Sequence, residues 1–133
     1  MPAQATLRTI AEHLRSANGF SPIATVHEQL KNIEDAYEIQ SINRKEWITQ
    51  GRLVTGYKVA FTTAESQQIF GADEPVYGTL FEDMRCPTNS TIEAGRLAHP
   101  KLEGEIVLEL NTDLPAKPLS PEEIASAVGA FYI

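Results

Sequence analysis

The apolar residues near the N-terminus recur with a helical period, three and four residues apart. A first amphipathic helix is expected to end at Asn18-Gly19, and a second is expected to begin near Asn32 and end at Gly51. The expected stripes are Leu7, Ile10, Ala11 and Leu14 in the first helix, and Ala36, Ile39, Asn43 and Trp47 in the second. The polar Asn43 interrupts the second stripe.

After Gly51 the pattern becomes extended, with β-branched and aromatic residues between Gly and Pro breaks. Strands are expected at residues 53–62, 76–81, 91–94 and 102–110. A short helix between the first two would carry a capping box formed by Thr62 and Glu65, and Gly71 would end it. Pro121 stands at the first position of a last helix, which is expected to run to Ile133.

Helices therefore come first and strands dominate the middle, an order that favours an α+β fold. We expect residues 1–133 to form one domain, with residues 1–52 mainly helical and residues 53–133 mixed β with a C-terminal helix. The apolar content of 42% over 133 residues is sufficient for one sizeable core.

The charge balance of the sequence limits the classes of molecule that the protein is expected to bind. A net charge of -7, with eleven scattered basic residues, argues against a nucleic-acid partner, which would need clustered Lys and Arg. No stretch approaches the roughly 18 apolar residues of a membrane span, and the first residues mix charged and apolar types unlike a signal peptide. Cys86 is the only cysteine, so no intramolecular disulfide can form. A cytoplasmic location is expected.

Glu103 and Glu105 are the first candidates for chemistry. On a strand over residues 102–110 their side chains would share one face, where two carboxylates repel each other unless a cation, a proton or solvent intervenes. Mg²⁺ or Mn²⁺ is the hard ion that such oxygens prefer, although a third ligand or a chelating substrate would be needed. The alternative is a half-buried strand whose acidic face lies in water.

Lys58, Gly78 and His99 are further candidates, each with an ordinary structural alternative. Lys58 either faces a substrate carboxylate or a developing enolate, or extends its ammonium group to solvent from an edge strand. Gly78 interrupts a strand pattern, as glycine does where a ligand or a second backbone approaches closely. His99, before a proline, could orient a carboxylate or lie in a surface loop.

Several motifs in order resemble one family. They include Gly56-Tyr57-Lys58-Val59 and the segment from His99 to Ile106, with further matching segments at residues 35–40, 70–81 and 111–115. Together they resemble the 2-keto-4-pentenoate hydratase and 4-oxalocrotonate decarboxylase family of the fumarylacetoacetate hydrolase superfamily. The resemblance implies a mixed, barrel-like β fold of which this chain would be the N-terminal half.

The resemblance also implies roles for particular residues. Glu103 and Glu105 would be two of three acidic ligands for Mg²⁺ or Mn²⁺, and Lys58 would line the pocket of a small 2-oxo acid substrate. In such enzymes the metal chelates the substrate's 1-carboxylate and 2-oxygen and stabilises an enolate, after which water adds or carbon dioxide leaves. The implied substrate-binding residues are Lys58, Tyr77, Gly78, Thr79 and Leu80.

Two departures from the family pattern bear on function. Similar proteins are about twice as long, and their third acidic ligand would follow Ile133, so this chain is expected to be truncated and to need a partner chain or a homo-oligomer. Val76 stands where such hydratases tend to carry Asp and the decarboxylases an apolar residue.

The leading hypothesis is a metal-dependent lyase that adds water to a 2-oxo or 2-hydroxy dienoate in the meta-cleavage catabolism of aromatic compounds. The alternatives are a 4-oxalocrotonate decarboxylase and a non-catalytic truncated fragment or assembly subunit. Whether the chain by itself is an enzyme stays open at this point, because the third metal ligand would lie outside it.

Overall fold

The computed structural model describes residues 4–17, 23–93, 95, 97 and 100–133. The chain divides into two compact units, residues 1–99 and residues 100–133. The described residues contain helices and two separate two-stranded antiparallel sheets, which agrees with an α+β composition. The expectation of a single domain stays a prediction. In the described residues, no helix is long and apolar enough to cross a membrane.

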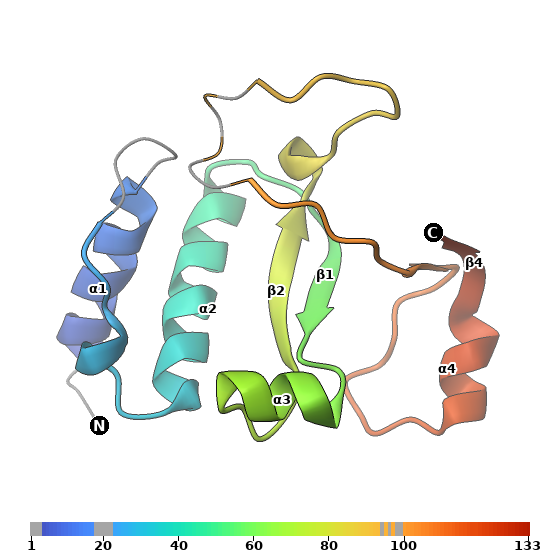
Figure 1. Cartoon of the computed structure of the whole chain (residues 1–133), viewed down its shortest axis with the longest axis horizontal. Coiled ribbons are helices and arrows are strands. Elements are labelled where there is room, and N and C mark those ends of the chain that lie inside the picture. The colour runs from blue at the N-terminus through green and yellow to red at the C-terminus, as the bar shows by residue number, and fades with distance from the viewer. Residues whose placement is uncertain (1–3, 18–22, 94, 96, 98–99) are drawn as a thin grey trace. The chain divides into compact units, whose positions relative to one another are not determined.

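Two helices of the first unit lie side by side, α1 (Gln4–Ser16) and α2 (Ile33–Thr49), with a 3-10 turn at His27–Gln29 before α2 (Figure 1). Their contact buries Leu7, Ile10 and Ala11 of the stripe expected in α1 and Ile39 of the stripe expected in α2. Both predicted helices are thus confirmed, whereas Asn18-Gly19 lies outside the described residues.

Asn43, which interrupts the expected stripe, is only 5% exposed. Its Oδ1 accepts a hydrogen bond from the Arg15 guanidinium of α1, so the buried amide is satisfied across the helix pair. Asn32 caps α2 by accepting a hydrogen bond from the Asp35 backbone N–H at 3.0 Å. The hydrogen bond between Arg15 and Asn43 therefore joins two helices that are otherwise held by apolar packing.

The β1–β2 hairpin completes the first unit. Strand β1 (Val54–Ala60) pairs antiparallel with β2 (Val76–Phe81), and helix α3 (Ala64–Phe70) connects them. The hairpin packs beside α2, where the Phe81 ring contacts Trp47 edge to face with 5.6 Å between ring centroids (Figure 1). Phe81 is 1% exposed, so this contact ties the hairpin to the helical layer.

The cap of α3 differs from the predicted one by a residue. Thr63, not Thr62, is the N-cap, because Thr63 has the extended backbone that a cap requires. Its side chain accepts from the Ser66 N–H at 3.2 Å, so Ser66 takes the place expected for Glu65 in the capping box. Gly71 ends the helix with φ 65°, as predicted.

In the second unit the one predicted strand is shorter than expected, and a strand replaces the end of the last helix. Helix α4 (Pro121–Ala127) begins at the predicted proline but does not reach Ile133. Instead β4 (Val128–Tyr132) turns back and pairs antiparallel with β3 (Val107–Leu110). The expected strand over residues 102–110 therefore exists only from Val107, since β4 offers no partner to residues 101–106.

Residues 91–93 form no strand, so that prediction was wrong for the described part of segment 91–94. A short polar segment of this kind needs a neighbouring strand to satisfy its backbone N–H and C=O groups. None of the sheets in the described residues includes it.

Candidate functional site

Lys58 and Gly78 lie directly opposite each other in the β1–β2 pair. The neighbouring pairs are Tyr57 with Thr79 and Val59 with Tyr77. Because side chains alternate along a strand, Lys58 and Gly78 belong to one face of the hairpin, and Tyr57, Tyr77 and Thr79 to the other. The predicted substrate-binding residues are therefore divided between two faces.

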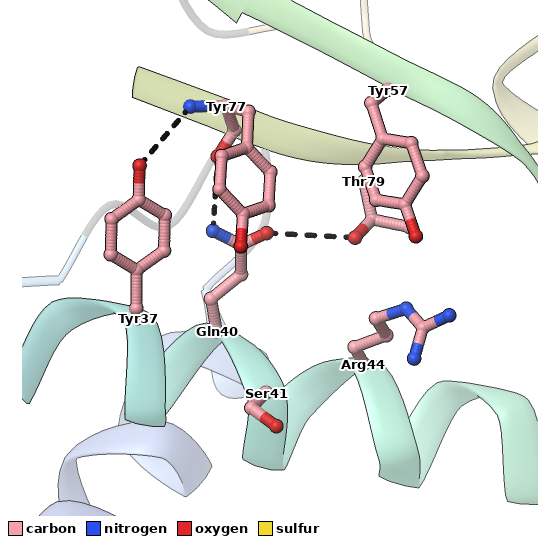
Figure 2. A pocket seen from close by; sticks show the side chains of 7 residues that line it. All are labelled: Tyr37, Gln40, Ser41, Arg44, Tyr57, Tyr77 and Thr79. Carbon is pink, nitrogen blue, oxygen red and sulfur yellow. Dashed lines mark hydrogen bonds between the residues drawn. The ribbon is translucent and has the colours of Figure 1, made fainter. Parts of the chain in front are cut away.

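The face with Tyr77 is turned towards α2 (Figure 2). The Tyr37 and Tyr77 rings stack with 4.9 Å between centroids, and Tyr57 meets Tyr77 edge to face at 5.9 Å. Gln40 Nε2 donates to the Tyr77 carbonyl at 3.1 Å, and the Thr79 hydroxyl donates to Gln40 Oε1 at 3.5 Å. Side chains of α2 thus hold Tyr77 and Thr79 in place.

A cavity of about 210 Å³ opens between α2 and this face. Its lining consists of Tyr37, Gln40, Ser41 and Arg44 from α2, Tyr57 from β1, and Tyr77 and Thr79 from β2 (Figure 2). Five of these residues were missed by sequence reasoning. A signal was present, because the four residues of α2 are spaced at i, i+3, i+4 and i+7 and so share one helical face.

Arg44 supplies the formal charge of this cavity. Figure 2 shows its guanidinium rising from α2 towards Tyr57 and Thr79. The Arg44 Nε is buried and has no hydrogen-bond partner among the described residues. No Asp or Glu lines the cavity, so the local charge is positive in a protein whose net charge is -7.

On the opposite face of the hairpin, Lys58 is half-buried beside open space. A Cβ built on Gly78 would meet no atom within 4 Å apart from its chain neighbours. Val76 belongs to the same face, opposite Ala60, and is half-buried. Leu80 also belongs to this face and is 38% exposed. A lysine beside an accessible glycine and apolar neighbours is an arrangement that can bind the carboxylate of a small ligand.

Glu103 and Glu105 lie in the second unit, in the segment before β3, and both are exposed. This segment is not a strand, so strand alternation does not establish that the two side chains share a face. Their carboxylate oxygens suit Mg²⁺ or Mn²⁺, but two ligands do not complete a site. Among the described residues, no group of three or more His, Cys, Asp or Glu is arranged to hold a metal ion.

The metal-binding role of Glu103 and Glu105 and the substrate-binding role of Lys58 therefore stay predictions. Tyr77, Gly78, Thr79 and Leu80 stay predicted substrate-binding residues as well. His99 lies outside the described residues.

Among known proteins, this chain is similar in sequence to 2-keto-4-pentenoate hydratases. It is 36% identical over 121 residues to the 2-keto-4-pentenoate hydratase of Paraburkholderia xenovorans (strain LB400), a match that covers 91% of this chain and 45% of that protein. It is 38% identical over 95 residues to 2-keto-4-pentenoate hydratase 2 of Dechloromonas aromatica (strain RCB), covering 70% of this chain and 36% of that protein. No protein-family model matches the chain.

The fold has a solved counterpart in 4-oxalocrotonate decarboxylase from Pseudomonas putida G7, whose structure is complexed with magnesium and adipate. The TM-score is 0.88 at 23% sequence identity, and the match covers 96% of this chain and 50% of that one. The chain spans about half the length of the hydratase from Paraburkholderia xenovorans and of this decarboxylase. The chain is thus similar in sequence, along 91% of its length, to a 2-keto-4-pentenoate hydratase, and in fold to half of 4-oxalocrotonate decarboxylase, the two enzymes whose family its motifs resemble.

Proposed function

We propose that this chain is the N-terminal half of a metal-dependent lyase, and that the complete protein adds water to a 2-oxo or 2-hydroxy dienoate from the catabolism of aromatic compounds. The main support is the 36% identity to a 2-keto-4-pentenoate hydratase along 91% of the chain. The accessible Gly78 beside Lys58 adds independent support, because it leaves room for a substrate next to a cation.

Each residue has a distinct role in this proposal. Lys58 would bind the negatively charged carboxylate of the substrate, and Gly78 would let the carbon chain of the substrate approach the strand. Glu103 and Glu105 would supply two carboxylate ligands for Mg²⁺ or Mn²⁺, and a third acidic ligand would come from outside the chain. The bound ion would supply Lewis-acid polarisation of the substrate's 1-carboxylate and 2-oxygen.

A decarboxylase is the second candidate, and Val76 favours it. This apolar residue belongs to the same face of the hairpin as Lys58 and Gly78 and offers no group for proton transfer. The fold is also that of half of 4-oxalocrotonate decarboxylase. Removal of carbon dioxide and addition of water would both place negative charge on the 2-oxygen of the substrate. One set of ligands that stabilises this charge would therefore serve either reaction.

We also propose that the barrel-like core requires a further chain segment, from a homo-oligomer or a partner chain. All four residues of β3 are exposed, and a two-stranded sheet alone is marginally stable in water. A cytoplasmic location without a nucleic-acid partner belongs to the same proposal and rests on the acidic sequence with one cysteine. A non-catalytic fragment or assembly subunit is the rival from another class.

Metal titration and turnover together test the proposal. The protein to titrate is the longer one that includes the half this chain lacks. Calorimetry of that protein with Mg²⁺ and Mn²⁺ should show saturable binding. Glu105→Gln should weaken this binding at least about tenfold, whereas Glu93→Gln, at an exposed position, should leave it unchanged. 2-Hydroxypenta-2,4-dienoate and 4-oxalocrotonate are then supplied with the metal, and loss of dienoate absorbance is compared with release of carbon dioxide. If the longer protein binds no metal and consumes neither substrate, the result would support the non-catalytic reading.

A further inference from the structure

The cavity between α2 and the β1–β2 hairpin belongs to the face of the hairpin opposite Lys58. The lyase proposal assigns no role to Tyr37, Gln40, Ser41, Arg44 or Tyr57, which form most of its wall. These side chains are nevertheless organised, since a tyrosine stack and the Gln40 hydrogen bonds fix the walls. A cavity with fixed walls is typical of a binding site rather than of a loosely packed surface.

The charge of the cavity selects an anion. Arg44 lies in the wall without an acidic residue beside it, and none of the ion pairs between described residues includes it. Its Nε is buried and unpartnered, and a buried N–H left without an acceptor destabilises the fold. A carboxylate would satisfy this donor and the charge together, because its two oxygens match the guanidinium fork.

The shape of the cavity selects a small planar ligand. Tyr37, Tyr57 and Tyr77 present aromatic rings, which interact best with flat, conjugated groups. The Ser41 hydroxyl, and the Nε2 hydrogen of Gln40 that its bond to the Tyr77 carbonyl leaves over, offer the few polar contacts that orient such a ligand. A volume of about 210 Å³ is below that of sites for drug-sized molecules, so the ligand has roughly the size of one ring.

We propose that this cavity is a binding site for a small planar carboxylate, held by the Arg44 guanidinium between the tyrosines of α2, β1 and β2. The site is centred on Arg44 and not on Lys58, because Lys58 and Tyr57 are adjacent in β1 and their side chains leave opposite faces. Tyr77 and Thr79, which the resemblance assigned to substrate binding, belong to the face with this cavity. The site does not depend on bound metal or on the part of the family's length that this chain lacks.

Benzoate is the probe, titrated into the 133-residue chain without metal and followed by amide chemical shifts in NMR spectra. Saturable shifts are expected at residues 37–44 and 77–79. Benzamide has the same shape without the charge, and cyclohexanecarboxylate has the charge without the planarity. Each should bind at least about tenfold more weakly than benzoate, and equal binding of either compound would overturn the inference.

Variants locate the anion. Arg44→Gln should weaken benzoate binding at least about tenfold, while Arg8→Gln, which removes the same charge from the exposed face of α1, should not change it. Should Arg44→Gln fail to fold, Ser41→Asp places a carboxylate three residues from Arg44 on the same helical face and should also abolish binding. Benzoate binding that survives Arg44→Gln but is lost in Lys58→Met would refute this site and leave the lyase proposal standing. Absence of metal binding, with benzoate binding still lost in Arg44→Gln, would count against the lyase proposal and leave this site standing.

Discussion

Lys58 and Gly78 lie opposite each other across the β1–β2 hairpin, and a Cβ built on Gly78 would meet no atom within 4 Å apart from its chain neighbours. Gly78→Ala should therefore leave the free energy of unfolding unchanged or raise it by up to about 1 kcal/mol, because alanine restricts the unfolded chain. Urea unfolding measures this. In the complete lyase the same methyl group should raise KM for the dienoate, since it occupies the space proposed for substrate.

Gly71→Ala is the matched control. Its Cβ would also meet nothing within 4 Å, but Gly71 has φ 65°, a left-handed conformation that side chains disfavour. This variant should lose about 1–2 kcal/mol in the same urea experiment. Equal stabilities of the two variants would contradict the assigned backbone conformations.

The helix pair gives the second prediction. Ile39 is 3% exposed in the core between α1 and α2, so Ile39→Ala should lower the free energy of unfolding by about 2–5 kcal/mol through lost burial and a cavity. Ile48 lies on the same helix but is 41% exposed, and Ile48→Ala should cost less than about 1 kcal/mol. Similar losses from both substitutions would show that α2 packs through a different face.

How much of this fold can be predicted from local sequence depends on how far apart the interacting residues lie along the chain. The helices of the first unit were predictable, because the spacing of Leu7, Ile10 and Ile39 and the cap at Asn32 are local signals. The end of α4 was not, since β4 forms only by pairing with β3, some twenty residues earlier in the chain. A pattern such as residues 102–106 suits a strand, but a strand forms only where a partner is present.

The candidate site was predictable to a similar extent. The motifs indicated Lys58 and Gly78. They did not indicate which residues share a face with them, because this depends on the strand pairing and on its register shift between Val54 and Gly56. Arg44 and its neighbours look like a solvated helix face in the sequence. Their role in a cavity depends on the packing of the hairpin against α2, which no local pattern contains.

Gly129 and Asn111 give the third prediction. A Cβ on Gly129 would stand 2.1 Å from Asn111 Oδ1, so Gly129→Ala forces that side chain to move. Because Asn111 is an exposed side chain that can turn aside, we expect a loss of no more than about 1 kcal/mol, measured by thermal or urea unfolding. Gly104→Ala, in the same unit with nothing within 4 Å, should show no loss.

A double-mutant cycle tests the cause. Asn111→Ala in the Gly129→Ala background removes the obstructing amide and should recover most of the lost stability. If the two effects simply add, the strain assigned to this contact is absent.

The last prediction concerns Tyr132 and Glu109, which approach each other across the β3–β4 pair. The Tyr132 hydroxyl donates to Glu109 Oε2 at 2.6 Å, and this hydrogen bond, with the carboxylate charge, raises the pKa of Tyr132 from its ordinary value of 10.0. Because the folded pKa is the higher one, the bond contributes its full stability below about pH 10 and loses it as the pH rises through the folded pKa. A ¹³C NMR titration of labelled tyrosine should show the Tyr132 midpoint fall towards 10.0 in Glu109→Gln, while Glu122→Gln, in the same unit, should leave it in place. An unchanged midpoint in Glu109→Gln would mean that the two side chains do not meet in solution.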